Sequence, residues 1–164
     1  MSYAFSDGTL IDRSYDGLVF GRDGRILGQT WLEPGALKLR EIAQTQLHYS
    51  LQELASRENN WDGRGSLAAN GRSVFEASAF LEAALKNTID LQLNWSSPHL
   101  GLDEYGYVVM EWWSGRNKLT IYITPNFPEY VCSWGQNIDE HMHSDEFKAG
   151  DFPRLWRWLW TQTN

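Results

Sequence analysis

An acidic run in the last quarter of the chain holds side chains that divalent metals prefer. The run Asp139-Glu140-His141-Met142-His143-Ser144-Asp145-Glu146 places two histidines among four carboxylates. On a strand, His141 and His143 would face the same side and could both bind a divalent metal, with Glu140 or Asp145 nearby. Such a site would support metal-dependent hydrolysis.

The same run also has the composition of a polar loop. Ser144 or Asp145 could begin a short turn of helix, because both side chains are good helix caps. The other histidines, His48 and His99, are too few to predict a third ligand. The sequence therefore favours a solvated acidic loop and no cofactor, with a divalent-metal site as the alternative.

Nucleophilic and acid-base chemistry have weak candidates. Cys132, the single cysteine, alternates with aromatic residues of a predicted strand, which indicates a buried, inert thiol. Glu111 lies mid-strand among apolar residues, where its pKa could be raised, or it could pair with Arg116, Lys118 or an indole N–H. The chain has neither a Gly-x-Ser-x-Gly elbow nor a phosphate-binding Gly-Lys-Ser/Thr motif. The sequence thus predicts no catalytic residue.

Tryptophan is the unusual feature of the composition, with nine in 164 residues. Much of this aromatic area is expected in the core, yet Trp beside Arg is also typical of a protein-binding hot spot. Adjacent tryptophans on a strand must point to opposite faces, and a tryptophan on the terminal helix lies next to two arginines. The predicted binding residues are Trp112, Trp113, Trp156, Trp158, Arg154 and Arg157.

The charge balance narrows the class of partner. The formal net charge of −7 argues against a nucleic-acid-binding face and against docking on an anionic membrane. It is compatible with a partner protein that has a basic surface. The first residues lack the pattern of a signal peptide, and the apolar runs are too short to span a bilayer, so we expect a cytoplasmic protein. Nothing in the sequence indicates the oligomeric state.

Hydrophobic periodicity predicts one α+β domain over residues 1–164, with two helices packed on an antiparallel meander. Residues 1–33 are rich in Asp-Gly turns and include a predicted hairpin, with strands at 18–20 and 25–27. Residues 36–87 form a helical pair, residues 91–134 form the meander, and residues 151–162 form a Trp-rich terminal helix.

The segment ENNWDGRGS, Glu58 to Ser66, is predicted to join the two helices. An Asn ends the first helix, and Trp61 folds back over the ends of both helices. Asp62-Gly63 and Gly65 supply a tight turn with positive φ. Asn70 or Ser73 caps the second helix.

The segments NWDGRGS and VFEASAFLEAAL, followed by DEYGYVVMEWW and KLTIYIT, resemble a loose group of small uncharacterised bacterial proteins. These proteins are often carried on prophages and mobile elements, and the resemblance covers roughly residues 36–134. Members often have a Pro-containing run after the Gly-x-Gly, where this chain has Ser-Leu-Ala-Ala-Asn. The resemblance implies the fold and a mobile-element setting, and it implies no activity and no catalytic residue.

Together these patterns predict a non-enzymatic, acidic protein-binding module from a bacterium, phage or mobile element. It would act by occupying a partner's surface, as an immunity or anti-defence inhibitor does. The alternative is a metal-dependent hydrolase that uses His141 and His143.

Overall fold

The computed structural model describes residues 3–6, 9–12, 19–20, 34–135 and 140–161. The chain divides into two compact units, Met1–Glu41 and Ile42–Asn164, which we describe separately. The expectation of one domain over the whole chain stays a prediction.

The first unit contains a small antiparallel sheet. Its strands are β1 (Tyr3–Ser6), β2 (Thr9–Asp12) and β3 (Val19–Phe20), in that spatial order. The hairpin expected over residues 18–27 is not seen. Val19–Phe20 pairs with β2, and the expected turn and second strand lie outside the described residues. Helix α1 (Pro34–Ala55) begins in this unit and continues into the second.

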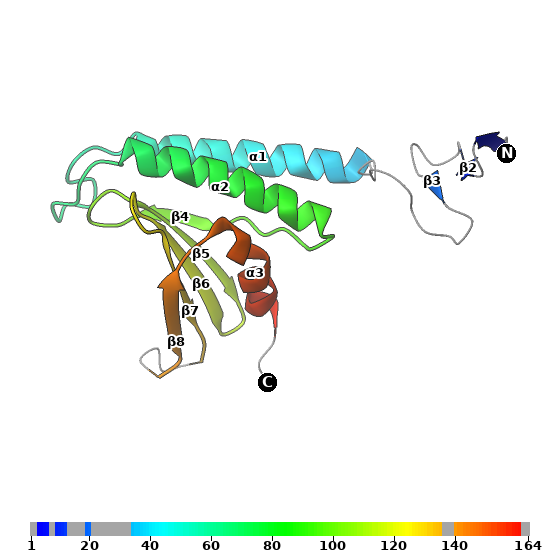
Figure 1. The fold of residues 1–164 in the computed structure, drawn as a ribbon. Coiled ribbons are helices and arrows are strands. Elements are labelled where there is room, and N and C mark those ends of the chain that lie inside the picture. Colours follow the sequence, from blue (N-terminus) through cyan, green and yellow to red (C-terminus); the bar gives the residue numbers. More distant parts are fainter. Residues whose placement is uncertain (1–2, 7–8, 13–18, 21–33, 136–139, 162–164) are drawn as a thin grey trace. The chain divides into compact units, whose positions relative to one another are not determined.

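The second unit has the predicted α+β architecture (Figure 1). Its sheet is a five-stranded antiparallel meander in the order β4-β5-β6-β7-β8. After α1, the elements are α2 (Gly71–Asp90), β4 (His99–Leu102), β5 (Val108–Ser114), β6 (Asn117–Ile123), β7 (Glu129–Ser133), β8 (Met142–Glu146), a 3-10 turn (Ala149–Asp151) and α3 (Phe152–Trp160). The meander therefore extends beyond residue 134 by the strand β8.

The helices place their apolar stripes against the core, as the periodicity predicts. Leu47, Leu51 and Leu54 of α1 are buried together with Ala77 and Leu81 of α2. The contacts of α2 and α3 with the sheet are made on β5 and β6, and Figure 1 shows α3 beside these strands. Strands β5 and β6 therefore make the main contacts of the sheet with α2 and α3.

Residues on β5 alternate between the two faces of the sheet. Val108, Met110 and Trp112 are buried, whereas Val109 and Glu111 are half-buried. The buried set continues on the neighbouring strands with Leu119, Ile121, Tyr130 and Cys132. One face of the sheet is therefore the core face, and the other carries partly exposed side chains.

An aromatic cluster joins α3 to this core face. Trp156 stacks on Trp95 at 5.8 Å and packs edge-on against Trp112 at 6.0 Å, while Phe152 lies 5.3 Å from Trp156 between ring centroids. Much of the unusual tryptophan content is therefore core, and the Trp-rich terminal helix is part of the cluster. The indole N–H groups of Trp156 and Trp112 also donate to backbone carbonyls of the segment before β4, at 3.2 and 2.9 Å.

One buried serine ties α2 to the sheet. Asn70 caps α2, because its side chain accepts a 3.0 Å hydrogen bond from the Ser73 N–H. The Ser73 hydroxyl is therefore not needed as a helix cap, and it faces the sheet. Its hydroxyl donates to the Ile123 carbonyl at 2.6 Å and accepts from the Val108 N–H at 2.8 Å. Val108 and Ile123 are paired residues of β5 and β6. A single side chain therefore joins a helix and two strands.

We expect Ser73→Ala to lower the free energy of unfolding by about 3 kcal/mol, because it leaves a buried N–H and a buried carbonyl without their partner. Urea denaturation of both proteins measures the difference. Ser78→Ala, at a half-buried serine of the same helix, is the matched control and should change stability by no more than about 0.5 kcal/mol. Equal effects of the two substitutions would show that the hydrogen bonds of the Ser73 hydroxyl, which we call the Ser73 bridge, contribute nothing specific to stability.

Candidate functional site

The six residues predicted to bind a partner do not form one patch. Trp112 and Trp156 belong to the core, with exposed fractions of 2% and 1%. Trp113 is 51% exposed, because neighbouring residues on a strand point to opposite faces. It therefore lies on the face of the sheet opposite the aromatic cluster.

The remaining predicted binding residues lie on α3. Trp158 is half-buried, with its ring 6.2 Å from that of Trp134. The exposed Arg154 reaches the Tyr130 hydroxyl at 3.5 Å and Asp151 at 3.7 Å. Arg157 is also exposed. The arginines thus border a mostly packed tryptophan, and the exposed aromatic side chain of α3 is Trp160, at 44%.

The register of the meander defines the opposite face, which we call the outer face. One row of this face runs Trp113, Lys118, Ser133, Met142 across four strands. The next two rows contain the half-buried residues Val109, Tyr122 and Val131, with His99, Gly101, Glu111, Thr120, Glu129, Ser144 and Glu146. Trp113 and Met142, at 51% and 50%, are the exposed large hydrophobic side chains of the outer face.

Trp113 is held in place by its neighbours. The Lys118 ammonium lies 5.2 Å from the centre of the indole and also pairs with the Glu111 carboxylate at 2.5 Å. The His99 ring lies 6.1 Å away. These partly exposed contacts stabilise the fold by at most about 1 kcal/mol. They orient the ring, so a partner would meet a tryptophan that has already lost much of its rotamer freedom.

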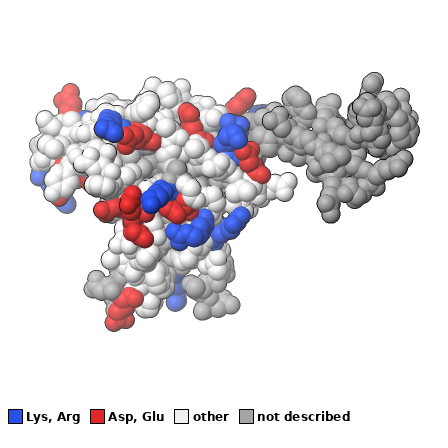
Figure 2. Space-filling model, in the orientation of Figure 1, with Lys and Arg blue, Asp and Glu red and all other residues white. Residues whose placement is uncertain are grey.

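Glu111 is therefore an ion-paired residue on a half-exposed face. Of the two possibilities that the sequence leaves open, the structure shows the pairing with Lys118. Figure 2 shows acidic and basic side chains interspersed over the visible face of the described residues. This distribution does not resemble a single-sign field of the kind that binds nucleic acid.

The acidic run that could have bound a metal is a strand and not the expected loop. Residues Met142–Glu146 form β8, which pairs with β7 along its length. All five side chains are exposed. A strand with no buried side chain has no apolar alternation, so its sequence pattern resembles that of a loop. The short helical turn expected in this region begins only at Ala149.

The two histidines of this run each contact an aromatic side chain. The His143 Nε2 lies 3.1 Å from the Tyr130 hydroxyl, and the His141 ring lies 6.1 Å from that of Trp134. Asp145 accepts a hydrogen bond from the Glu146 N–H at 2.8 Å, and Glu140 is exposed. Within the described residues, which omit 136–139, no group of three or more His, Cys, Asp or Glu side chains is arranged to hold a metal ion.

Cys132 is buried, as its place in the strand predicts. It is 5% exposed, and burial raises the pKa of its thiol to about 11. The thiol is therefore protonated at neutral pH and is a poor nucleophile.

The ENNWDGRGS segment is a self-contained loop. The Asp62 carboxylate accepts hydrogen bonds from the Arg64 N–H at 2.9 Å and the Ser66 hydroxyl at 2.7 Å, and these bonds lower its pKa. Asn60, Gly63 and Gly65 have positive φ. The predicted tight turn is therefore present, and the polar atoms of Asp62 bind the loop's own backbone.

Trp61 does not cover the two helix ends as predicted. It is 37% exposed, and the Arg57 guanidinium lies 4.5 Å above its ring. A tryptophan in a Gly-rich loop resembles a core anchor in sequence, but this loop is held by its own hydrogen bonds and does not require the ring to be buried.

Sequence reasoning missed the contact between residues 67–70, which follow this loop, and the β4–β5 turn. The Leu67 N–H donates to the Glu104 carbonyl at 3.0 Å, and the Asn70 N–H donates to the Gly106 carbonyl at 2.8 Å. The segment Leu67–Asn70, between NWDGRGS and α2, therefore meets DEYGY through backbone atoms. The glycine in DEYGY was the available signal, because an isolated glycine beside a strand often marks a close backbone approach.

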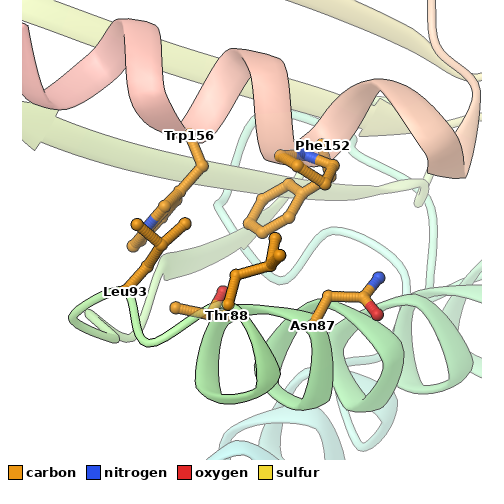
Figure 3. A pocket seen from close by; sticks show the side chains of 7 residues that line it. Asn87, Thr88, Leu93, Phe152 and Trp156 are labelled. Atoms are coloured by element: carbon orange, nitrogen blue, oxygen red, sulfur yellow. The ribbon is translucent and has the colours of Figure 1, made fainter. Parts of the chain in front are cut away.

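Two hollows in the second unit are small. The first, between α2 and α3, has about 150 Å³ including open solvent, with Phe152 and Trp156 facing Thr88 and Leu93 (Figure 3). The second, between α1 and α2, has about 290 Å³ including open solvent and is bordered by His48 and Glu82. Both lie below the roughly 300–1,000 Å³ of small-molecule sites. No helix in the described part of the chain is long and apolar enough to cross a membrane.

Searches against protein-family models, curated proteins and solved structures find no match for this chain. The function proposed below therefore rests on the geometry of the chain itself.

Proposed function

We propose that this protein is a non-enzymatic protein-binding module that acts by occupying the surface of a partner protein. Immunity and anti-defence inhibitors of bacteria, phages and mobile elements act in this manner. The observation that carries the proposal is the outer face of the sheet, with Trp113 at 51% exposure and oriented by Lys118.

The physical case begins with the rigidity of this face. A strand in the middle of a meander is fixed by hydrogen bonds on both sides, and β5 pairs with β4 and β6. Binding through it orders little new backbone, so more of the interaction free energy appears as affinity. Trp is also the residue type most enriched among interface hot spots.

The charges of the outer face indicate the chemistry of the partner. Three carboxylates, Glu111, Glu129 and Glu146, lie on it with one ammonium, that of Lys118. Lys118 is already paired with Glu111, and no ion pair among the described residues involves Glu129 or Glu146. A partner with basic groups around an apolar centre would complement this surface.

We expect Trp113→Ala to weaken partner binding by about 30-fold, which is the loss of about 2 kcal/mol typical of a hot spot. The measurement is affinity capture from cells that produce the protein, followed by titration of the purified partner. The control is Phe75→Ala, since Phe75 is 74% exposed on α2, away from the sheet, and its removal should leave the affinity unchanged.

A partner that binds Trp113→Ala and the unaltered protein equally would contradict the proposal. So would stoichiometric Zn, Mn or Fe that is lost in the double variant His141→Ala/His143→Ala, because that result favours the metal-dependent hydrolase. Thermal unfolding of every variant shows that a loss of binding is not a loss of fold.

A further inference from the structure

Among the described residues, the strand β8 is an edge of the meander with no strand beyond it. It is last in the sheet order, it pairs with β7, and its five side chains are all exposed. An edge strand presents a row of backbone donors and acceptors that can template another strand. The register shows which of these groups point outward.

Two hydrogen bonds, one at each end of β8, show which β7–β8 residue pairs are hydrogen-bonded. The Trp134 N–H donates to the His141 carbonyl at 2.9 Å, and the Phe147 N–H donates to the Pro128 carbonyl at 2.6 Å. Hydrogen-bonded and non-hydrogen-bonded pairs alternate in antiparallel sheets. His143 and Asp145 therefore bond toward β7, whereas Met142, Ser144 and Glu146 direct their backbone groups outward.

One of the outward groups already has a partner. The Glu146 N–H donates to the Asp145 carboxylate at 2.8 Å. Met142 and Ser144 have no hydrogen-bond partner for their outward N–H groups within the described residues. The free donors of the edge are therefore two residues apart, which is the spacing of a strand-addition site.

The carboxylates of β7 and β8 are Glu129, Asp145 and Glu146, and the Arg154 guanidinium of α3 contacts Tyr130, the partner of Asp145 in the register. Glu129 and Glu146 lie directly opposite each other on β7 and β8, and like charges at opposed positions are destabilising. Asp145 precedes Glu146 on β8 and points to the opposite face, and neither β7 nor β8 contains Lys or Arg. None of the ion pairs among the described residues involves Glu129 or Glu146. Cations from outside would relieve this repulsion.

We propose that an extended segment of the partner, carrying two adjacent basic residues, adds to β8 as the next strand of the sheet. Adjacent residues of a strand point to opposite faces, so one basic side chain would lie beside Glu129 and Glu146 and the other beside Asp145. A second copy of this chain fits less well, because its β8 would bring the same carboxylates. This inference rests on the proposed function and specifies how the partner binds.

The test uses the full-length protein and a fluorescently labelled synthetic peptide, Thr-Val-Lys-Arg-Val-Thr-Val. We expect the peptide to bind by fluorescence anisotropy and to slow hydrogen exchange of the Met142 amide. A peptide with Glu-Glu in place of Lys-Arg should not bind. Ser144→Pro should weaken binding at least 10-fold, because proline removes an outward N–H and spares the bonds to β7. Ser144→Ala keeps that N–H and should bind like the unaltered protein.

Three results would overturn strand addition: no binding of the basic peptide, equal binding by Ser144→Pro, or a dimer of the unaltered protein that Ser144→Pro makes monomeric. Trp113→Ala distinguishes this inference from the proposed function. It should leave peptide binding unchanged while it weakens binding of the whole partner. Partner binding that depends on Trp113 but not on Ser144 would therefore reject only the strand addition.

Discussion

Replacing Gly106 with alanine is expected to lower the free energy of unfolding by about 4 kcal/mol, because strain and overpacking act together at this position. Gly106 has a φ of +80°, and a Cβ built on it would lie 2.0 Å from the carbonyl oxygen of Ala68. That oxygen belongs to backbone, so it cannot move aside as a flexible side chain would. The same glycine accepts the Asn70 hydrogen bond, and a shift of either segment would break it.

The control for this prediction is Gly115→Ala. Gly115 has a φ of +59°, but its Cβ would meet no atom within 4 Å. This variant carries the conformational cost alone, about 1 kcal/mol. Chemical denaturation of the three proteins separates strain from steric exclusion. If both variants lost the same stability, the packing of the segment Leu67–Asn70 on the β4–β5 turn would not be tight.

Asn117→Asp is expected to cost about 4 kcal/mol at neutral pH. Asn117 is 4% exposed, and its Nδ2 lies 3.3, 3.2 and 2.9 Å from the carbonyl oxygens of Trp158, Leu159 and Thr161. These carbonyls form the negative end of the α3 dipole. A carboxylate in the same place would be an acceptor facing acceptors, with a negative charge added.

Asn117→Ala removes the donor without adding charge, and we expect it to cost about 2 kcal/mol. The two variants also differ in their dependence on pH. The carbonyls would raise the folded-state pKa of the introduced carboxyl, so the folded state binds the proton more tightly than the unfolded state. The extra loss in Asn117→Asp is therefore largest above the folded-state pKa and disappears as the pH falls below the unfolded one. A constant difference between the variants from pH 3 to pH 8 would contradict this account.

The elements that bury a regular pattern were predictable. Leu47, Leu51 and Leu54 repeat at helical spacing, and Val108, Met110 and Trp112 alternate as in a strand with one buried face. Each pattern repeats because each side chain meets the same core. The opposite orientations of Trp112 and Trp113 follow from the same geometry.

The features that the sequence did not predict depend on long-range backbone contacts or on exposure. β8 has no apolar alternation, because none of its side chains is buried. In the sequence, Asn117 looks like an ordinary turn residue. Its role depends on three carbonyls that lie 41 to 44 residues later in the chain. The split of the predicted binding patch has a similar cause, since the number of tryptophans does not indicate how many the core can accommodate.

The hydrogen bond from the Val108 N–H to Ser73 also makes the exchange of this amide proton a measure of whether α2 and the sheet separate. The Val108 N–H donates to a helix side chain, at 2.8 Å, so it exchanges with solvent only when α2 leaves the sheet or the whole domain unfolds. Amides in the middle of β5 and β6 can exchange through local fraying of the ladder. The exchange rate at Val108 therefore measures how strongly the helical layer holds the sheet, separately from how strongly the strands hold one another.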